Sequence, residues 1–157
     1  SLAVSVDRRD WVILNASPDI RQQCALTPEL APSGLRDSPL KSVVLTNGDI
    51  DHIAGLLTLR EKTAFTVFAT AQTLDILAQN SVFRVLDPDL VAQKPIALDT
   101  PFAPVEGLEV TAFAVPGKVD APRMLREQVL RSAQLLIHRW WPFCIGPDAS
   151  INSRRGD

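Results

Sequence analysis

Short apolar runs punctuate the first two thirds of the chain at intervals that predict strands. The runs "LAVSV" and "WVILN" flank the charged "DRRD", which is the pattern of a β-hairpin with a solvated tip. "KSVVLT" and "FTVFAT" carry β-branched residues suited to buried strands, and "GLEVTAFAV" alternates as a strand does. A β-sheet therefore forms the framework of the predicted fold.

Helical periodicity appears between these strands. A short helix is expected from Ile20, with Asp19 accepting hydrogen bonds from its first amides. "TAQTLDILAQN" predicts a longer helix with Thr70 as its N-cap. Strands that alternate with helices predict an α/β layered domain. A further helix is expected between these two, with an inward face of Ile53, Leu56 and Leu57 and with Arg60 at its far end. The expected inward face of the helix that Thr70 caps consists of Leu74, Leu77 and Ala78.

The pattern weakens twice further along the chain. From Val82 to Pro104 only short, proline-punctuated segments are predicted. After residue 118 the stripe of Leu125, Val129, Ala133, Leu136 and Trp140, with arginines beside it, predicts one amphipathic helix. We therefore divide the chain into a layered domain, residues 1–118, and a divergent tail, residues 119–157. The tail helix is expected to cover the core, and resting on a membrane surface is the less favoured alternative.

Composition narrows the classes of protein. The chain has 157 residues, of which 46% are hydrophobic and 22% charged, and this is ordinary for a globular domain with one core. Its net charge of -2 lacks the dense basic face that nucleic acid requires, so no nucleic-acid partner is expected. No apolar run is long enough to span a membrane and no leader peptide is evident, so a cytoplasmic protein is expected.

The candidate chemistry lies in "TNGDIDHIAGLL", residues 46–57. Asp51 and His52 can both donate lone pairs to a divalent metal, with Asp49 and the amide oxygen of Asn47 as further oxygen donors. From spacing alone the favoured interpretation is simpler, namely that Asp49 or Asp51 caps the following helix. The chain has two histidines, so one copy cannot build a three-histidine centre. The two cysteines are too far apart to form a C-x-x-C zinc pair.

This stretch resembles the signature loop of the metallo-β-lactamase superfamily, T-H-x-H-x-D-H followed by an apolar helix. Asn47 and Asp49 stand at the positions of the two leading histidines, while Asp51 and His52 keep the closing pair. "NASPDIRQQ" and "LEVTAFAVPGKV" narrow the resemblance to the members that serve biosynthesis of pyrroloquinoline quinone (PQQ), over roughly residues 1–119. The resemblance implies an αββα sandwich of which only about the first half is present.

The resemblance also implies a function. Asp51 and His52 become candidate catalytic residues and metal ligands, with Asp49 and Asn47 beside them, and the expected metal is iron(II) or zinc in an incomplete ligand set. The implied activity is an iron-dependent oxygenase acting on the tyrosine ring of the Glu-Tyr precursor of PQQ. The implied partners are that small precursor or PQQ itself, other PQQ biosynthesis proteins, and a second copy of the chain in a homodimer.

Two alternatives stay open at this stage. The first is a non-enzymatic carrier that takes PQQ or its precursor to the periplasm. The second is a truncated, non-functional remnant, whose half-fold would leave one sheet face without a partner and prone to association. The carrier would pair its cargo's carboxylates with Arg21, Arg36, Arg60 and Lys118, and the unpartnered face would be lined by Val43, Leu45, Val67 and Val110.

Overall fold

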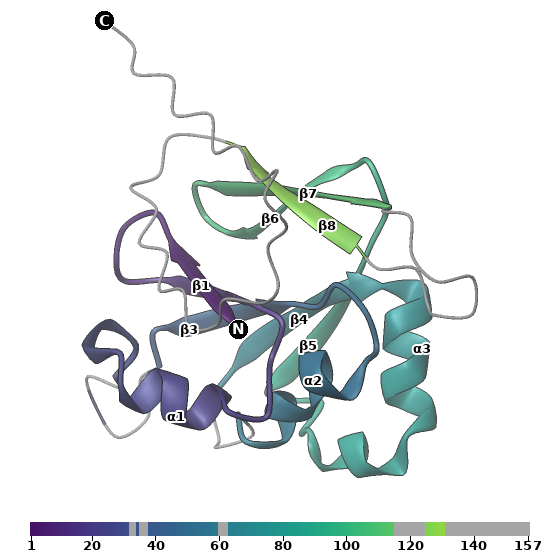
Figure 1. Cartoon of the computed structure of the whole chain (residues 1–157), viewed down its shortest axis with the longest axis horizontal. Coiled ribbons are helices and arrows are strands. Elements are labelled where there is room, and N and C mark those ends of the chain that lie inside the picture. The colour runs from purple at the N-terminus through teal and green to yellow at the C-terminus, as the bar shows by residue number, and fades with distance from the viewer. Residues whose placement is uncertain (32–33, 35–37, 60–62, 115–124, 131–157) are drawn as a thin grey trace, which may run out of the picture.

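The computed structural model describes residues 1–31, 34, 38–59, 63–114 and 125–130, the last range by its backbone alone. A five-stranded sheet lies in the middle of this part of the chain. Helices cover one of its faces and a three-stranded sheet covers the other (Figure 1). This is the α/β layered architecture that the alternation of strands and helices predicts.

The central sheet has the order β1-β2-β3-β4-β5. Its strands are β1 (Leu2–Ser5), β2 (Trp11–Leu14), β3 (Leu40–Val44), β4 (Phe65–Thr70) and β5 (Val91–Ile96). β1 pairs with β2 antiparallel, which confirms the predicted hairpin, and β2 to β5 pair parallel. The parallel strands therefore end at one common edge of the sheet.

Helices connect the parallel strands. They are α1 (Ile20–Ala25), η1 (Pro28–Leu30), α2 (Ile50–Ile53), η2 (Ala54–Leu57), α3 (Ala71–Gln79) and η3 (Ser81–Val85), where η marks 3₁₀ turns. Thr70 caps α3 as predicted, since its side chain accepts from the Thr73 amide. Asp19 makes no side-chain cap bond to α1, so that prediction is wrong. Among the described residues no helix is long and apolar enough to cross a membrane.

The second sheet has the order β6-β7-β8, all antiparallel. Its strands are β6 (Pro101–Val105), β7 (Leu108–Ala114) and β8 (Leu125–Leu130). β7 was predicted, whereas β5 and β6 lie in the stretch where only short segments were expected. β8 corrects the start of the predicted tail helix, because residues 125–130 pair with β7 as a strand; the rest of that helix lies outside the described residues.

The apolar residues divide into two cores, one on each face of the central sheet. The first packs the sheet against the helices through residues such as Trp11, Leu45 and Leu56, each fully buried. Leu77 and the partly buried Leu74 join this core from α3, as predicted. The predicted third member of that helical face, Ala78, is exposed instead, and the residue of α3 that is buried beside Leu77 is Thr73.

The second core fills the space between the two sheets. Val44 and Phe68 project into it from the central sheet, and Leu108 and Val110 from β7. The four residues expected to line one unpartnered face do not do so. Val110 packs between the sheets, whereas the other three, Val43, Leu45 and Val67, face the helices, and all four are at most 1% exposed.

A buried hydrogen bond joins the two sheets. Ser42 of β3 donates from Oγ to the carbonyl oxygen of Pro104 in β6 at 2.6 Å. We expect Ser42→Ala to lower the free energy of unfolding by about 1–3 kcal/mol, since a buried carbonyl loses its donor. Chemical denaturation measures the change. The control is Ser81→Ala at an exposed position, expected to shift the value by less than about 0.5 kcal/mol; equal values for the two variants would contradict the prediction.

Candidate metal centre

Two loops meet at the carboxyl edge of the parallel strands. The site turn, residues 46–55, follows β3 and contains α2 and the start of η2. The β2–α1 loop, residues 15–19, follows the neighbouring strand β2. Ligands bind preferentially at this edge of parallel sheets, because loops from adjacent strands come together there. The fold thus places "TNGDIDHIAGLL" where a binding site is expected.

Three predicted site residues converge in the site turn. The ligand atoms of Asp49, Asp51 and His52 all lie within 4.8 Å of one another. His52 Nδ1 and Asp51 Oδ1 are 3.1 Å apart, with 18% of the His52 side chain and 70% of the Asp51 side chain exposed. Both residues belong to α2. A helix of a single turn allows their side chains to approach.

Asn47 holds Asp49 of this cluster in place by two hydrogen bonds. Its side chain is fully buried, its Nδ2 donates to Asp49 Oδ2 at 3.1 Å, and its Oδ1 accepts from the Asp49 amide at 3.0 Å. Asp49 occupies the N-cap position of α2 yet makes no side-chain cap bond. The interpretation favoured from spacing, a carboxylate that caps the helix, is therefore wrong for Asp49, whose side chain stays available to a ligand.

The helix after the motif is shorter than predicted. α2 ends at Ile53 and continues as the 3₁₀ turn η2 to Leu57. Ile53 and Leu56 are buried as expected, Leu57 is partly buried, and Arg60 lies outside the described residues. The two short helical turns α2 and η2 thus leave the carboxylates of Asp49 and Asp51 exposed at the sheet edge, while Ile53 and Leu56 pack into the core.

The β2–α1 loop holds the site turn in place, a role that the sequence pattern did not reveal. Asn15 Oδ1 accepts from Thr46 through both its amide (2.9 Å) and its Oγ1 (3.0 Å). The Ala16 amide donates to the His52 carbonyl at 2.7 Å, and the Ala16 carbonyl accepts from the Gly55 amide at 2.8 Å. The detectable signal was an asparagine directly after a strand, a residue type that tolerates left-handed backbone.

Two carboxylates and an imidazole suit a borderline divalent cation such as Zn²⁺ or Fe²⁺. Their donor atoms lie close enough together for one metal ion to contact all three, so these residues could supply part of its ligand set. They offer three side chains, fewer than the four ligands of a closed zinc site. Such a set leaves coordination positions for other ligands, as catalytic metal sites do.

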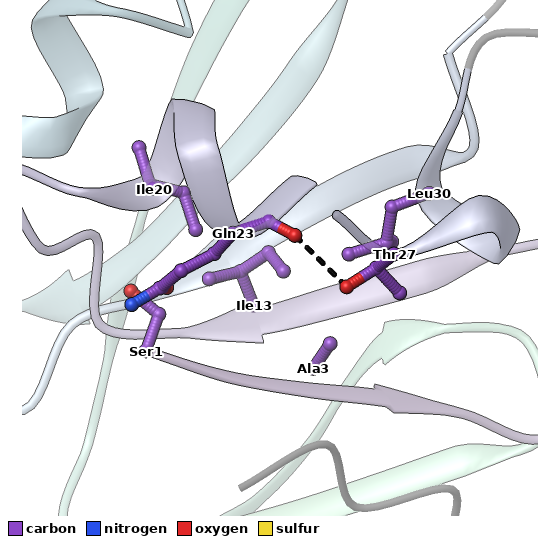
Figure 2. Close-up of a pocket in the computed structure, with 7 residues that line it drawn as sticks. All are labelled: Ser1, Ala3, Ile13, Ile20, Gln23, Thr27 and Leu30. Carbon is purple, nitrogen blue, oxygen red and sulfur yellow. Dashed lines mark hydrogen bonds between the residues drawn. The ribbon is translucent and has the colours of Figure 1, made fainter. Parts of the chain in front are cut away.

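A small cavity lies elsewhere, between the β1–β2 hairpin and α1 (Figure 2). Its volume of about 10 Å³ is room for about one water molecule, and none of the three clustered residues lines it. This cavity is far too small for the cargo of the carrier hypothesis, PQQ or its precursor. Its lining consists of Ser1, Ala3, Ile13, Ile20, Gln23, Thr27 and Leu30, and Figure 2 shows the bond from Thr27 Oγ1 to the Gln23 carbonyl.

Other reactive groups add little to the site. Burial raises the pKa of the Cys24 thiol, which keeps it protonated and a poor nucleophile at neutral pH. Cys24 is partly buried. Of the cations considered for a carboxylate cargo, Arg21 is exposed, and Arg36, Arg60 and Lys118 lie outside the described residues.

Comparison with known proteins points to one family. The family model for the beta-lactamase superfamily domain matches residues 10–137. The chain is 59% identical over 119 residues to coenzyme PQQ synthesis protein B of Rhizobium meliloti and 60% identical over 120 residues to that of Methylobacterium sp. strain 4-46. Each match covers 76% of this chain, whereas the chain spans only 39% and 40% of the two relatives.

Solved structures agree on the fold. The crystal structure of Zn²⁺-bound PqqB from Methylobacterium extorquens superposes with a TM-score of 0.80 at 45% identity, covering 87% of this chain and 51% of that one. A diphosphatase of the PhnP family gives a TM-score of 0.63 at 18% identity, covering 81% and 47%. The second likeness concerns the fold alone.

Proposed function

This chain belongs to the beta-lactamase superfamily, and from that premise we propose that it takes part in PQQ biosynthesis as a metal-dependent oxygenase. The substrate would be the tyrosine ring of a small Glu-Tyr precursor, and the reaction would take place in the cytoplasm with other PQQ biosynthesis proteins. The observation that carries the proposal is the convergence of Asp49, Asp51 and His52 at the sheet edge. The high identity to coenzyme PQQ synthesis protein B supports the pathway.

In this proposal Asp51 and His52 hold the metal, and Asp49 is the third side chain in reach. Asn47, predicted as a fourth ligand, has its amide oxygen engaged by the Asp49 amide, so its main part is to orient Asp49. The relative of known structure binds Zn²⁺, and iron(II) is the metal the oxygenase requires. The remaining ligands would come from outside the described residues or from the substrate.

When bound, the metal would supply a centre at which molecular oxygen is activated for transfer to the ring. With O₂ as the oxidant, one oxygen atom would be inserted into a ring C–H bond and the other would leave as water, with two electrons from an external reductant and two protons from solvent. The chain's own contribution is positional. α2 presents Asp51 and His52 side by side, and the exposed carboxylates face solvent, where a peptide can approach.

A chimera tests the proposal. The aligned segment of the Rhizobium meliloti relative is replaced by the matching residues of this chain, so that the whole length of the relative is restored. We expect this chimera to oxygenate a Glu-Tyr peptide with Fe²⁺, O₂ and a reductant, detected by mass spectrometry as addition of one oxygen, and His52→Ala to abolish the product. Persistent oxygenation in the His52→Ala chimera would exclude the iron mechanism.

The carrier is the second candidate function, because it needs no metal; of the cations expected to pair with its cargo's carboxylates, the structure describes Arg21, which is exposed. It predicts that the chimera binds PQQ without converting a precursor, and that His52→Ala leaves this binding intact. The remnant hypothesis loses one support, since all four residues expected on an open sheet face are buried. A homodimer stays a prediction, which size-exclusion chromatography checks.

A further inference from the structure

The β2–α1 loop touches the site turn at both of its ends. At the start of the turn, Asn15 Oδ1 accepts two hydrogen bonds from Thr46. Asn15 adopts left-handed backbone, with φ of 58°, and this conformation aims its side chain from the end of β2 toward the end of β3. One amide group thereby fixes where the site turn leaves the sheet.

At the other end of the turn the contact is backbone to backbone. Ala16, itself fully buried, donates to the His52 carbonyl and accepts from the Gly55 amide, so it holds both the end of α2 and the start of η2. Gly55 makes this approach possible. A Cβ at Gly55 would collide with the Ser17 carbonyl oxygen and lie 2.8 Å from the carbonyl carbon of Ala16, and backbone atoms cannot swing aside as a side chain can.

We propose that Asn15 and Gly55 are positioning residues that hold Asp49, Asp51 and His52 in the arrangement that binds a metal. This inference rests on the proposed metal site and names the groups that support it. Neither residue would contact the metal. Asn15 fixes the entry of the turn, and Gly55 lets α2 lie against the β2–α1 loop.

The physical reason is preorganisation. α2 is a single turn, and the side chains of its N-cap Asp49 and of Asp51 are exposed, so little packing restrains these two carboxylates. If the ends of the turn loosen, the side chains sample many arrangements and binding must supply the cost of ordering them. Groups that orient metal ligands change affinity by about 10–100-fold when removed.

The first test uses Zn²⁺ alone with the full 157-residue chain. We expect Asn15→Gly to weaken Zn²⁺ binding by about 10-fold or more, because glycine keeps the left-handed backbone but removes the acceptor. Asn15→Asp keeps an oxygen at the same place and should retain affinity within about 3-fold. The control, Asn80→Ala, removes a side-chain bond to the Ile76 carbonyl at the far end of α3 and should leave affinity unchanged.

The second test separates position from stability. Gly55→Ala is expected to weaken Zn²⁺ binding by at least about 10-fold. Gly107→Ala also strains the protein, since Gly107 has φ of 77°, but a Cβ there meets only Val6 Cγ2 at 3.7 Å and lies in the β6–β7 turn. Equal loss of Zn²⁺ affinity in the two alanine variants would show that global destabilisation is the cause and would overturn the proposal.

Amide hydrogen exchange without metal gives a readout independent of the proposed function. The His52 and Ile53 amides donate to the Asp49 carbonyl at 2.9 and 3.1 Å and report the order of α2. Asn15→Gly and Gly55→Ala should speed their exchange, while Asn80→Ala should not. Unchanged exchange, or faster exchange with unchanged Zn²⁺ affinity, overturns the positioning roles. If the unaltered chain binds no Zn²⁺, the proposed metal site is wrong. The exchange rates then decide by themselves whether the β2–α1 loop orders the site turn.

Discussion

Replacing His52 with alanine is expected to reduce the affinity of this chain for one divalent metal by on the order of 100-fold or more, because metal affinity depends strongly on each donor of a small ligand set. His52 is the sole nitrogen donor in the Asp49–Asp51–His52 cluster. The unaltered chain should itself bind weakly, since three side chains make an incomplete shell. Calorimetric titration with Zn²⁺, and with Fe²⁺ under anaerobic conditions, measures both affinities.

The chain contains its own matched control. His138→Ala makes the same chemical change in the tail and should leave the metal affinity as it was, because the family resemblance carries no ligand to that position. A comparable loss of metal affinity in both histidine variants would show that the metal is not bound specifically at the site turn. A tight one-to-one iron complex in the unaltered chain would contradict the expectation of an incomplete ligand set.

Trp11→Ala is expected to cost about 3–5 kcal/mol of the free energy of unfolding, the usual range for truncating a large buried aromatic residue. Trp11 is fully buried at the start of β2, in the core between the central sheet and the helices. A loss of that size is a large part of the stability of a typical domain. Urea denaturation followed by far-UV circular dichroism measures this loss. The Trp11→Ala variant should unfold at lower urea concentrations than the unaltered chain.

Trp11→Phe separates the ring from its polar atom. Within the part of the chain that the structure describes, Trp11 Nε1 is buried without a hydrogen-bond acceptor. Phenylalanine keeps most of the aromatic contact area and removes that unsatisfied N–H group, so its cost should be well below that of alanine. A cost for phenylalanine equal to that for alanine would contradict this expectation.

The strands that the sequence predicted are those buried on both faces or alternating clearly. β4 consists mostly of β-branched and aromatic residues and β3 ends in Val43 and Val44; helices cover one face of both strands and the second sheet covers the other. β5 escaped prediction since it is an edge strand with mostly exposed, polar positions and a proline, Pro95. β6 contains two prolines and depends on pairing with β7. Periodicity alone does not reveal pairing of that kind.

The site was predictable in its donors but not in its support. The motif and the family resemblance led to Asp49, Asp51 and His52, which the fold brings together; their roles as ligands stay predictions. Asn15 could not be assigned by spacing, because its bond to Thr46 joins residues 31 positions apart. The change from α2 to a 3₁₀ turn was likewise hidden, since it follows from the contact of Gly55 with a distant loop.

The strand order of the central sheet bears on how the protein is made. In the order β1-β2-β3-β4-β5 every strand pairs with the strand that precedes it in the chain. From β2 onward, each strand of this sheet therefore leaves the ribosome when a partner is already synthesised, and only β1 has to wait for a later strand. The sheet can grow from β1 toward β5 at the pace of translation, because the edge formed by the newest strand is the one that the next strand covers.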